Sequence, residues 1–155
     1  MRIALYQPDI AGNVGTILRL AACLAVPVDI IEPCGFPLGD RQLKRAAMDY
    51  GAATDTRRHA DWDSFHAAMQ AEGRRIVLLT SAAEQTIYAT AFDENDVLLM
   101  GSESAGAPPH VHDAAAIRAT IPMVPGFRSL NVAVATGMAL GEALRQTRYC
   151  AGAAT

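Results

Sequence analysis

Two short and almost uninterrupted apolar runs constrain the fold of this chain most. Residues 76–80 and 97–100 lack the alternation of polar and apolar positions that a half-exposed strand needs. Runs of this length are typical of parallel strands that helices bury on both faces. Residues 2–6 and 28–31 have the same character. The sequence therefore predicts a mainly parallel sheet flanked by helices on both faces, an α/β fold.

Segments with helical periodicity alternate with these strands. From Val14 the apolar positions recur with the three- and four-residue spacing of a helix with one buried stripe, and Pro27 prevents its continuation. Asp61 is a suitable cap for a helix that places Trp62, Phe65 and Met69 on one face. The remaining expectations are helices over 40–49 and 131–146, strands over 54–58 and 119–121, and an undecided stretch over 82–95. Alternation of this kind is the pattern of an α/β domain.

Length and composition favour one globular domain. The chain has 155 residues, of which 51% are hydrophobic and 19% charged, and a single domain commonly holds about 100–150 residues. No internal repeat, linker or low-complexity segment interrupts it. We expect residues 1–150 to form one domain and residues 151–155 a loose tail.

Several classes of protein are disfavoured. No apolar run approaches the roughly 20 residues that span a bilayer, and residues 2–6 are too short for a secretory signal, so we expect a cytoplasmic protein without a membrane partner. The three cysteines form no CxxC pair, and His110 and His112 lack a third ligand, so no metal is expected. Neither a Walker loop nor a GxGxxG fingerprint is present.

Charge leaves the substrate open. The formal net charge is −3, but phosphate contacts depend on individual Lys and Arg side chains. Each basic cluster fits a solvated surface at least as well as an RNA contact. These clusters are Arg41/Lys44/Arg45, Arg57/Arg58, Arg74/Arg75 and Arg145/Arg148.

A first polar segment begins the helix that follows residues 2–6. Its pattern is Asn13-x-Gly15-x-x-x-Arg19. Asn13 lies where the unpaired amides of a helix start meet polar ligands, and Gly15 and Arg19 are four residues apart on one face. A capping Asn, a Gly needed for close packing and a solvated Arg would explain the same residues.

A second segment, residues 100–108, follows a buried strand. Ligands of open α/β sheets bind beyond the carboxyl ends of strands. Gly101 and Gly106 permit close approach of backbone to a ligand, and Glu103 is the one charged residue in the stretch. The alternative is a glycine-rich turn before a short helix capped by Ser104.

A third segment, residues 121–132, is stiffened by Pro122 and Pro125 before the last helix. Ser129 is a natural cap for that helix. The helix itself is rich in small residues, which suits close packing in the core or across a dimer interface.

In this order and spacing the three segments resemble the SPOUT methyltransferases, and among them the minimal tRNA (cytidine/uridine-34) 2′-O-methyltransferases. The resemblance covers nearly the whole chain and includes residues 30–36, 43–46 and 49–50. It implies a deep trefoil knot at the C-terminal end, a homodimer, and methyl transfer from S-adenosyl-L-methionine to the ribose of the wobble nucleotide of tRNA, leaving S-adenosyl-L-homocysteine. It also implies a contact with the anticodon region and no DNA partner.

The resemblance also carries site residues by matching position. The implied cofactor-binding residues are Leu79, Thr80, Gly101, Glu103, Gly106, Ile121, Met123, Ser129 and Leu130; the implied catalytic residues are Asn13, Arg19, Glu103, Ser129 and Asn131. Arg19 is expected near the 2′-hydroxyl, either as a clamp on a phosphate or as the base. The chain departs from the family pattern at residues 11–12, where a Pro pair is common, and at residues 126–127, where a more polar pair is common.

Two other functions remain open from the sequence. The same chemistry could act on another tRNA position or on ribosomal RNA. Alternatively, the chain could be a knotted RNA-binding factor without catalysis. A generic nucleotide-binding α/β domain is disfavoured by the missing phosphate-binding motifs.

Overall fold

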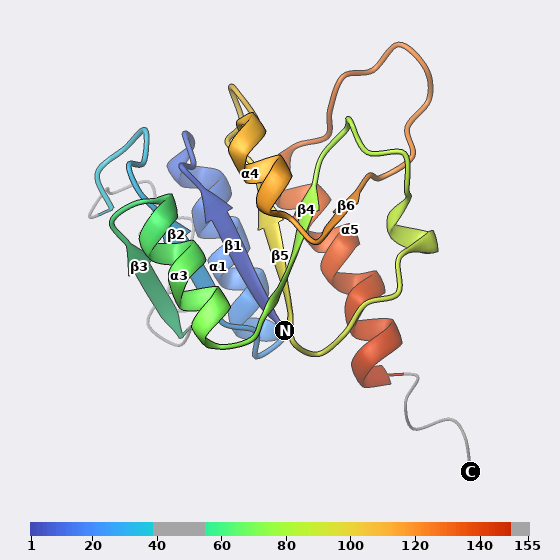
Figure 1. Ribbon diagram of the computed structural model, residues 1–155. Coiled ribbons are helices and arrows are strands. Elements are labelled where there is room, and N and C mark those ends of the chain that lie inside the picture. Colours follow the sequence, from blue (N-terminus) through green and yellow to red (C-terminus); the bar gives the residue numbers. More distant parts are fainter. Residues whose placement is uncertain (39–54, 150–155) are drawn as a thin grey trace.

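A computed structural model describes residues 1–38 and 55–149. Within this part, six strands form one parallel sheet in the order β3-β2-β1-β5-β4-β6 (Figure 1). The predicted α/β fold with a parallel sheet is confirmed. The strands are β1 (Arg2–Tyr6), β2 (Val28–Ile31), β3 (Thr56–His59), β4 (Arg75–Leu79), β5 (Asp96–Met100) and β6 (Ile117–Ala119); the helices are α1 (Ala11–Cys23), α3 (Trp62–Ala71), α4 (Pro109–Ala114) and α5 (Val132–Leu144), with a 3₁₀ turn η2 (Ile87–Ala89) and a π-helical turn η3 (Arg145–Tyr149).

Helices cover both faces of the sheet. α1 and α5 lie on one face, and α3 and α4 lie on the other (Figure 1). Successive strand residues point to opposite faces, so Ile3 and Leu5 pack under α1 and α5 while Ala4 and Tyr6 pack under α3 and α4. Every residue of β1 and β5 is buried, as their apolar character predicts.

The strand order reverses at β1. The chain runs from β1 outward through β2 to β3, then returns to build β4, β5 and β6 on the other side of β1. Loops that leave β1 and β5 therefore diverge at a point where the strand order reverses. Such a switch point is the usual ligand site of open α/β sheets.

Local sequence accounts for where α1 and α3 begin. α1 buries Val14, Ile17 and Leu18 in one stripe and ends at Cys23, and it begins three residues before the first predicted apolar position. α3 starts at a capping box in which Asp61 accepts a 2.8 Å hydrogen bond from the amide of Ser64. The predicted cap at Asp61 is thus confirmed.

Two predicted boundaries near the C-terminal end are wrong. β6 covers residues 117–119 instead of 119–121, because Thr120 leaves the sheet and pairs with the loop after β4: its amide donates to Gln85 O and its carbonyl accepts from the amide of Ile87, both at 2.8 Å. α5 is capped by Asn131 and not by Ser129, since the Asn131 side chain accepts from the amides at 133 and 134.

Other predicted segments differ in outcome. The undecided stretch over 82–95 contains the short turn η2. The predicted strand over 54–58 begins and ends slightly later, as β3. α4 starts at Pro109 with Pro108 as its cap residue, so Ser104 caps no helix. The helix expected over 40–49 and the tail over 151–155 lie outside the described residues.

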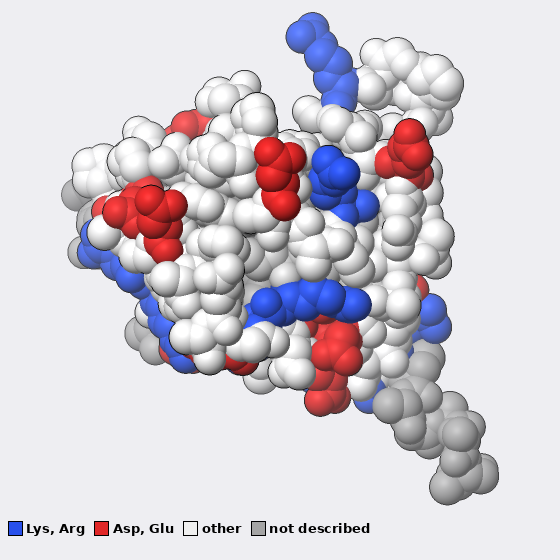
Figure 2. Space-filling model, in the orientation of Figure 1, with Lys and Arg blue, Asp and Glu red and all other residues white. Residues whose placement is uncertain are grey.

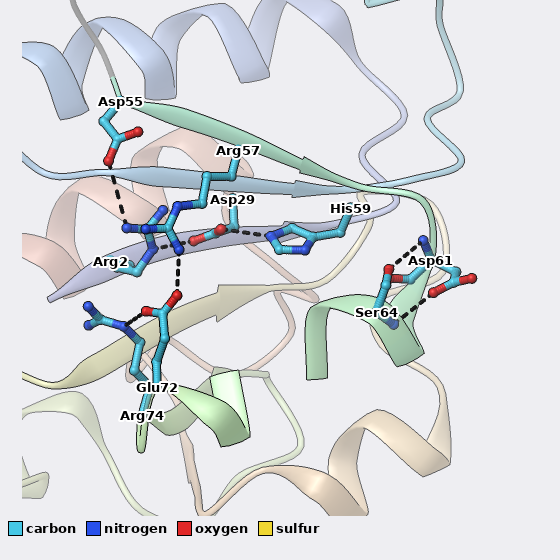
Figure 3. A network of polar contacts seen from close by, with 9 residues as sticks. All are labelled: Arg2, Asp29, Asp55, Arg57, His59, Asp61, Ser64, Glu72 and Arg74. Carbon is cyan, nitrogen blue, oxygen red and sulfur yellow. Dashed lines mark hydrogen bonds and ion pairs between the residues drawn. The ribbon is translucent and has the colours of Figure 1, made fainter. Parts of the chain in front are cut away.

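A buried polar network joins β1, β2 and β3 on the α3 side of the sheet (Figure 3). The fully buried carboxylate of Asp29 accepts from Arg2 Nε at 2.5 Å and lies 2.8 Å from His59 Nε2. A buried charge needs such partners because desolvation is costly. These contacts tie β1, β2 and β3 together.

Candidate functional site

A cavity of about 580 Å³ opens at the carboxyl ends of β4, β5 and β6, beside the start of α1. The loops after these strands form its walls, together with Ile10 and Asn13 from the start of α1. Every residue that the resemblance implies for cofactor binding lines it: Leu79, Thr80, Gly101, Glu103, Gly106, Ile121, Met123, Ser129 and Leu130. The sequence segments that look unlike scaffold therefore converge on one cavity.

A tight turn after β5 forms one wall. The amide of Ser102 donates to Gly106 O at 3.0 Å, and the amide of Gly106 donates back to Ser102 O at 2.9 Å. A Cβ on Gly101 would lie 2.6 Å from the carbonyl carbon of Gly106, and Gly106 has φ +68°, a region that favours glycine. Both glycines are needed for the backbone of residues 101–107 to fold back on itself in this turn.

A chain of side-chain hydrogen bonds links the three motifs. Glu103 Oε1 accepts from Asn13 Nδ2 at 2.9 Å, and Asn13 Oδ1 accepts from Asn131 Nδ2 at 2.9 Å. Asn131 in turn caps α5. These contacts bring together residues that are 90 and 118 positions apart in the sequence. We call Glu103, Asn13 and Asn131 the amide relay.

Asp9 is a site residue that the sequence reasoning missed. Its amide donates to Glu103 Oε2 at 2.8 Å, so both oxygens of that carboxylate have partners. Its own carboxylate accepts from Ser104 N at 2.9 Å and Ser104 Oγ at 2.6 Å. Asp9 therefore fastens the loop after β1 to the turn after β5. The available signal was an acidic residue shortly after a central strand, where α/β sheets place ligand sites.

Arg19 is placed differently from the other implied site residues. It lies on the exposed side of α1, and it is not among the residues that line the cavity of its own chain. Arg19 lies six positions after Asn13 in α1, which corresponds to about 9 Å along the helix axis. The structure brings Asn13, Glu103, Ser129 and Asn131 together and leaves Arg19 outside.

Comparison with known proteins identifies the family. Residues 1–141 match the model of the SpoU rRNA Methylase family, which is most of the chain. The chain belongs to the SpoU methylase family. Membership implies the C-terminal trefoil knot expected from the resemblance.

Relatives of this SpoU family member include proteins of nearly equal length. A tRNA (cytidine(34)-2'-O)-methyltransferase of Beijerinckia indica subsp. indica is 54% identical over 144 residues, which cover 93% of this chain and 90% of that protein. A solved structure described as giving structural insights into the 2-OH methylation of C/U34 on tRNA is 41% identical, with a TM-score of 0.89 and 94% of each chain covered. An AdoMet-bound rRNA methyltransferase from Sinorhizobium meliloti is 30% identical, with a TM-score of 0.86 over 93% of this chain and 55% of that one.

Carboxylates occupy most of the basic clusters of this SpoU family member. Arg57 and Arg74 both contact Glu72, at 2.5 and 2.6 Å, and Arg75 contacts Asp96 at 2.6 Å. Figure 2 shows Lys and Arg side chains scattered among acidic ones on the visible face. Arg58 and Arg145 also have acidic partners, Arg148 donates to a backbone carbonyl, and Arg41, Lys44 and Arg45 lie outside the described residues.

Neither a candidate metal site nor a membrane-spanning helix is present in the described ranges, 1–38 and 55–149. No set of three or more His, Cys, Asp or Glu side chains there is arranged to hold a metal ion. None of the helices in these ranges has the length and apolar character to cross a membrane.

Proposed function

We propose that this chain is an S-adenosyl-L-methionine-dependent 2′-O-methyltransferase of the wobble nucleotide of tRNA, cytidine or uridine 34. The observation that carries the proposal is the single cavity into which all three motifs converge. Relatives that match 95% and 93% of the chain carry the name of this activity, and an AdoMet-bound member of the fold supports the cofactor. We propose that the protein methylates tRNA in the cytoplasm.

The cavity suits a bent, amphipathic cofactor. Leu79, Ile121 and Leu130 supply apolar walls for an adenine ring, and the loops supply backbone donors and acceptors. Gly101 lets the backbone of residues 106 and 107 pack against it, which holds the turn that forms this cavity wall. Thr80, Glu103, Gly106, Met123 and Ser129 complete the proposed contacts. S-adenosyl-L-methionine supplies an electrophilic methyl group on sulfonium, and S-adenosyl-L-homocysteine is the product.

The protein's own task is to orient the ribose and handle one proton. Methyl transfer would join the 2′-oxygen to the methyl carbon as the bond from that carbon to sulfur breaks, and the hydroxyl proton would pass to Arg19 or to the neighbouring phosphate. We assign Asn13, Ser129 and Asn131 to orienting the hydroxyl, and Glu103 to fixing the orientation of the Asn13 amide through their 2.9 Å hydrogen bond. Orientation of this kind supplies on the order of 7–11 kcal/mol of barrier reduction in intramolecular reactions.

The protein is proposed to work as a homodimer. Val134 and Met138 lie four residues apart on α5 and are 52% and 39% exposed, although both are apolar. Val124 and Phe127, on the loop before α5, are 71% and 75% exposed. Exposed apolar surface of this extent marks interaction sites. A charged residue introduced as Val134→Glu should convert the dimer to monomers in sedimentation experiments.

A dimer offers Arg19 a place at the site. Because Arg19 does not line its own cavity, we propose that it reaches the cavity of the partner subunit, either as a clamp on a phosphate or as the base. A guanidinium with a pKa above about 12 is a poor base, which favours the clamp. Arg19→Lys should then fail, since Lys keeps the charge but loses the fork.

Subunit mixing tests this role of Arg19. Arg19→Ala alone should abolish methylation and leave cofactor affinity intact. A dimer of one Arg19→Ala subunit and one Ser129→Ala subunit should regain one working site if Arg19 serves the partner's cavity. If Arg19 acts within its own subunit, the mixed dimer has no intact site and stays inactive.

The activity itself is tested by mass spectrometry. Purified protein, S-adenosyl-L-methionine and tRNA should yield 2′-O-methylated cytidine or uridine at position 34. A methylated ribose at another tRNA position or in ribosomal RNA would support the alternative substrate. Calorimetry without detectable cofactor binding would support an RNA-binding factor without catalysis. Binding of tRNA should weaken steeply between low and moderate salt, as phosphate contacts require.

A further inference from the structure

One cation stands out on the cavity wall. Arg128 lines the cavity between the loop before α5 and the start of that helix, and it is exposed. The other residues of the described wall include no Lys, Arg or His. A positive charge in this position meets any ligand that enters.

Several other arginines are, in contrast, paired with carboxylates. Arg57, Arg58, Arg74, Arg75 and Arg145 each lie within 2.9 Å of a carboxylate. Arg128 has no such ion pair among the described residues.

The acidic residue of the same cavity is already engaged. Glu103 accepts from Asn13 Nδ2 at 2.9 Å and from the amide of Asp9 at 2.8 Å, one hydrogen bond on each oxygen. Glu103 forms no ion pair with Arg128. Its guanidinium presents several donors in a planar fork, the geometry that matches a phosphate.

We propose that Arg128 binds the backbone phosphate on the 3′ side of the nucleotide that is methylated. This inference rests on the proposed function. The 2′-hydroxyl and the 3′-phosphate are carried by adjacent ribose carbons, so a guanidinium that holds this phosphate also fixes where the hydroxyl lies. Arg128 adjoins Ser129 in the chain, and Ser129 also lines the cavity. Arg128 is thus a substrate-positioning residue contributed by the same chain as the cavity.

The cavity would also receive another anion, the carboxylate of the cofactor. The exposure of Arg128 favours the phosphate, because the RNA backbone has to pass over the exposed rim. Separate measurements of RNA and cofactor affinity distinguish the two ligands.

Arg118 provides a matched control. It is also an exposed arginine without an ion pair among the described residues. It pairs in register with Leu78, whose side chain packs on the α3 side of the sheet, so the two side chains point to the same face. Arg118 does not line the cavity. Arg118→Ala and Arg128→Ala remove the same charge at positions that differ in access to the ligand.

The first experiment measures tRNA binding by anisotropy over a range of salt, with S-adenosyl-L-homocysteine present. Arg128→Ala should weaken binding about tenfold and reduce the slope of log K against log salt by about one. Arg118→Ala should leave both values near those of the wild type. Equal effects of the two variants would overturn the proposal, as would no effect of Arg128→Ala. Loss of S-adenosyl-L-homocysteine affinity with unchanged tRNA binding would assign Arg128 to the cofactor carboxylate instead.

The second experiment identifies the phosphate. A tRNA with a neutral methylphosphonate linkage 3′ to the methylated nucleotide should bind the wild type about tenfold more weakly and Arg128→Ala less than about twofold more weakly, because the lost contact is the same. A neutral linkage two nucleotides away should affect both proteins equally. Equal losses at the target linkage would overturn the assignment. If no tRNA is methylated, the proposed function fails, and that result is read from turnover and not from these binding curves.

Discussion

The turn after β5 allows a prediction whose size follows from the coordinates. In Gly101→Ala, the new Cβ would lie 2.6, 2.8 and 2.9 Å from three backbone atoms of residues 106 and 107. Backbone atoms cannot swing aside as a flexible side chain can, so the turn has to open. Overpacking of this kind costs about 1–3 kcal/mol, and the two backbone hydrogen bonds between Ser102 and Gly106 contribute about 0.5–1 kcal/mol each. We expect a total loss of about 2–5 kcal/mol in the free energy of unfolding.

Thermal unfolding and calorimetry check this expectation. For a domain of this size, 1 kcal/mol corresponds to about 2–4 °C in Tm, so Gly101→Ala should unfold about 4–20 °C earlier. Affinity for S-adenosyl-L-homocysteine should fall at least about tenfold, or 1.4 kcal/mol. Gly12→Ala is the control, because a Cβ there meets nothing within 4 Å and helical Gly→Ala changes stabilise by up to about 1 kcal/mol. A Gly101→Ala protein with unchanged Tm and cofactor affinity would refute the reasoning.

Two further predictions concern carboxylates. Asp9→Ala removes two hydrogen bonds to the turn after β5 and keeps the backbone contact to Glu103. Steady-state kinetics should show a fall in kcat of about tenfold or more, since a small displacement of the groups that orient the substrate is costly. An unchanged kcat would contradict the role of Asp9. Hydrogen bonds from Arg74 and Arg57 lower the pKa of Glu72 to about 2 from the ordinary value of 4.5. A depressed carboxyl pKa stabilises the fold above the unfolded value and loses that effect as the pH falls toward the folded value. In denaturant titrations, Glu72→Gln should therefore lower the free energy of unfolding by up to about 1 kcal/mol at pH 7. The difference in unfolding free energy between wild type and variant should shrink below pH 4.5. A difference that stays constant with pH would contradict the assignment.

Much of the fold followed from the sequence because burial on both faces leaves a clear pattern. β1, β4 and β5 have continuous apolar runs, and Asp61 has the side chain that caps α3. Failures occurred where tertiary pairing decided the outcome. β6 ends early because Thr120 pairs with a loop some thirty residues before it, and Asn131 caps α5 while also donating to Asn13. No local pattern reports such partners.

The candidate site was predictable to a similar extent. The resemblance named the cavity residues, because residues 100–108 and 121–132 lie at the ends of β5 and β6, and Asn13 lies in the first turns of α1 beside them. It did not reveal Asp9, whose importance depends on contacts with Glu103 and Ser104 about ninety-five positions away. Nor could spacing show that Arg19 lies outside its own cavity. Helical periodicity gives the face of α1 on which Arg19 lies, and not its distance from loops that follow distant strands.

The amide relay makes a final prediction, because its hydrogen-bond directions are fixed by one charge. An ionised Glu103 only accepts, so Asn13 must turn its Nδ2 toward it and its Oδ1 toward Asn131, whose own Oδ1 is then free to cap α5. Gln in place of Glu103 offers one acceptor where two donors, Asn13 Nδ2 and the amide of Asp9, now meet a carboxylate. If the Gln side chain turns its oxygen toward Asn13, its Nε2 faces the amide of Asp9, and two donors meet. If it turns its oxygen toward the amide of Asp9, Asn13 and Asn131 must either leave two donors facing each other or both flip, and the flip of Asn131 removes the cap of α5.

Glu103→Gln should therefore destabilise the protein although the side chains have the same shape. One unpaired, part-buried donor costs about 1–3 kcal/mol, or about 2–12 °C in Tm at this chain length. Glu84→Gln makes the same chemical change at an exposed position and should leave Tm unchanged. Because the relay has a fixed polarity, we infer that it orients groups and does not carry the hydroxyl proton away, so that in the proposed reaction the proton acceptor is Arg19 or the substrate phosphate. Equal melting temperatures for Glu103→Gln and Glu84→Gln would contradict the fixed polarity, and with it this division of roles.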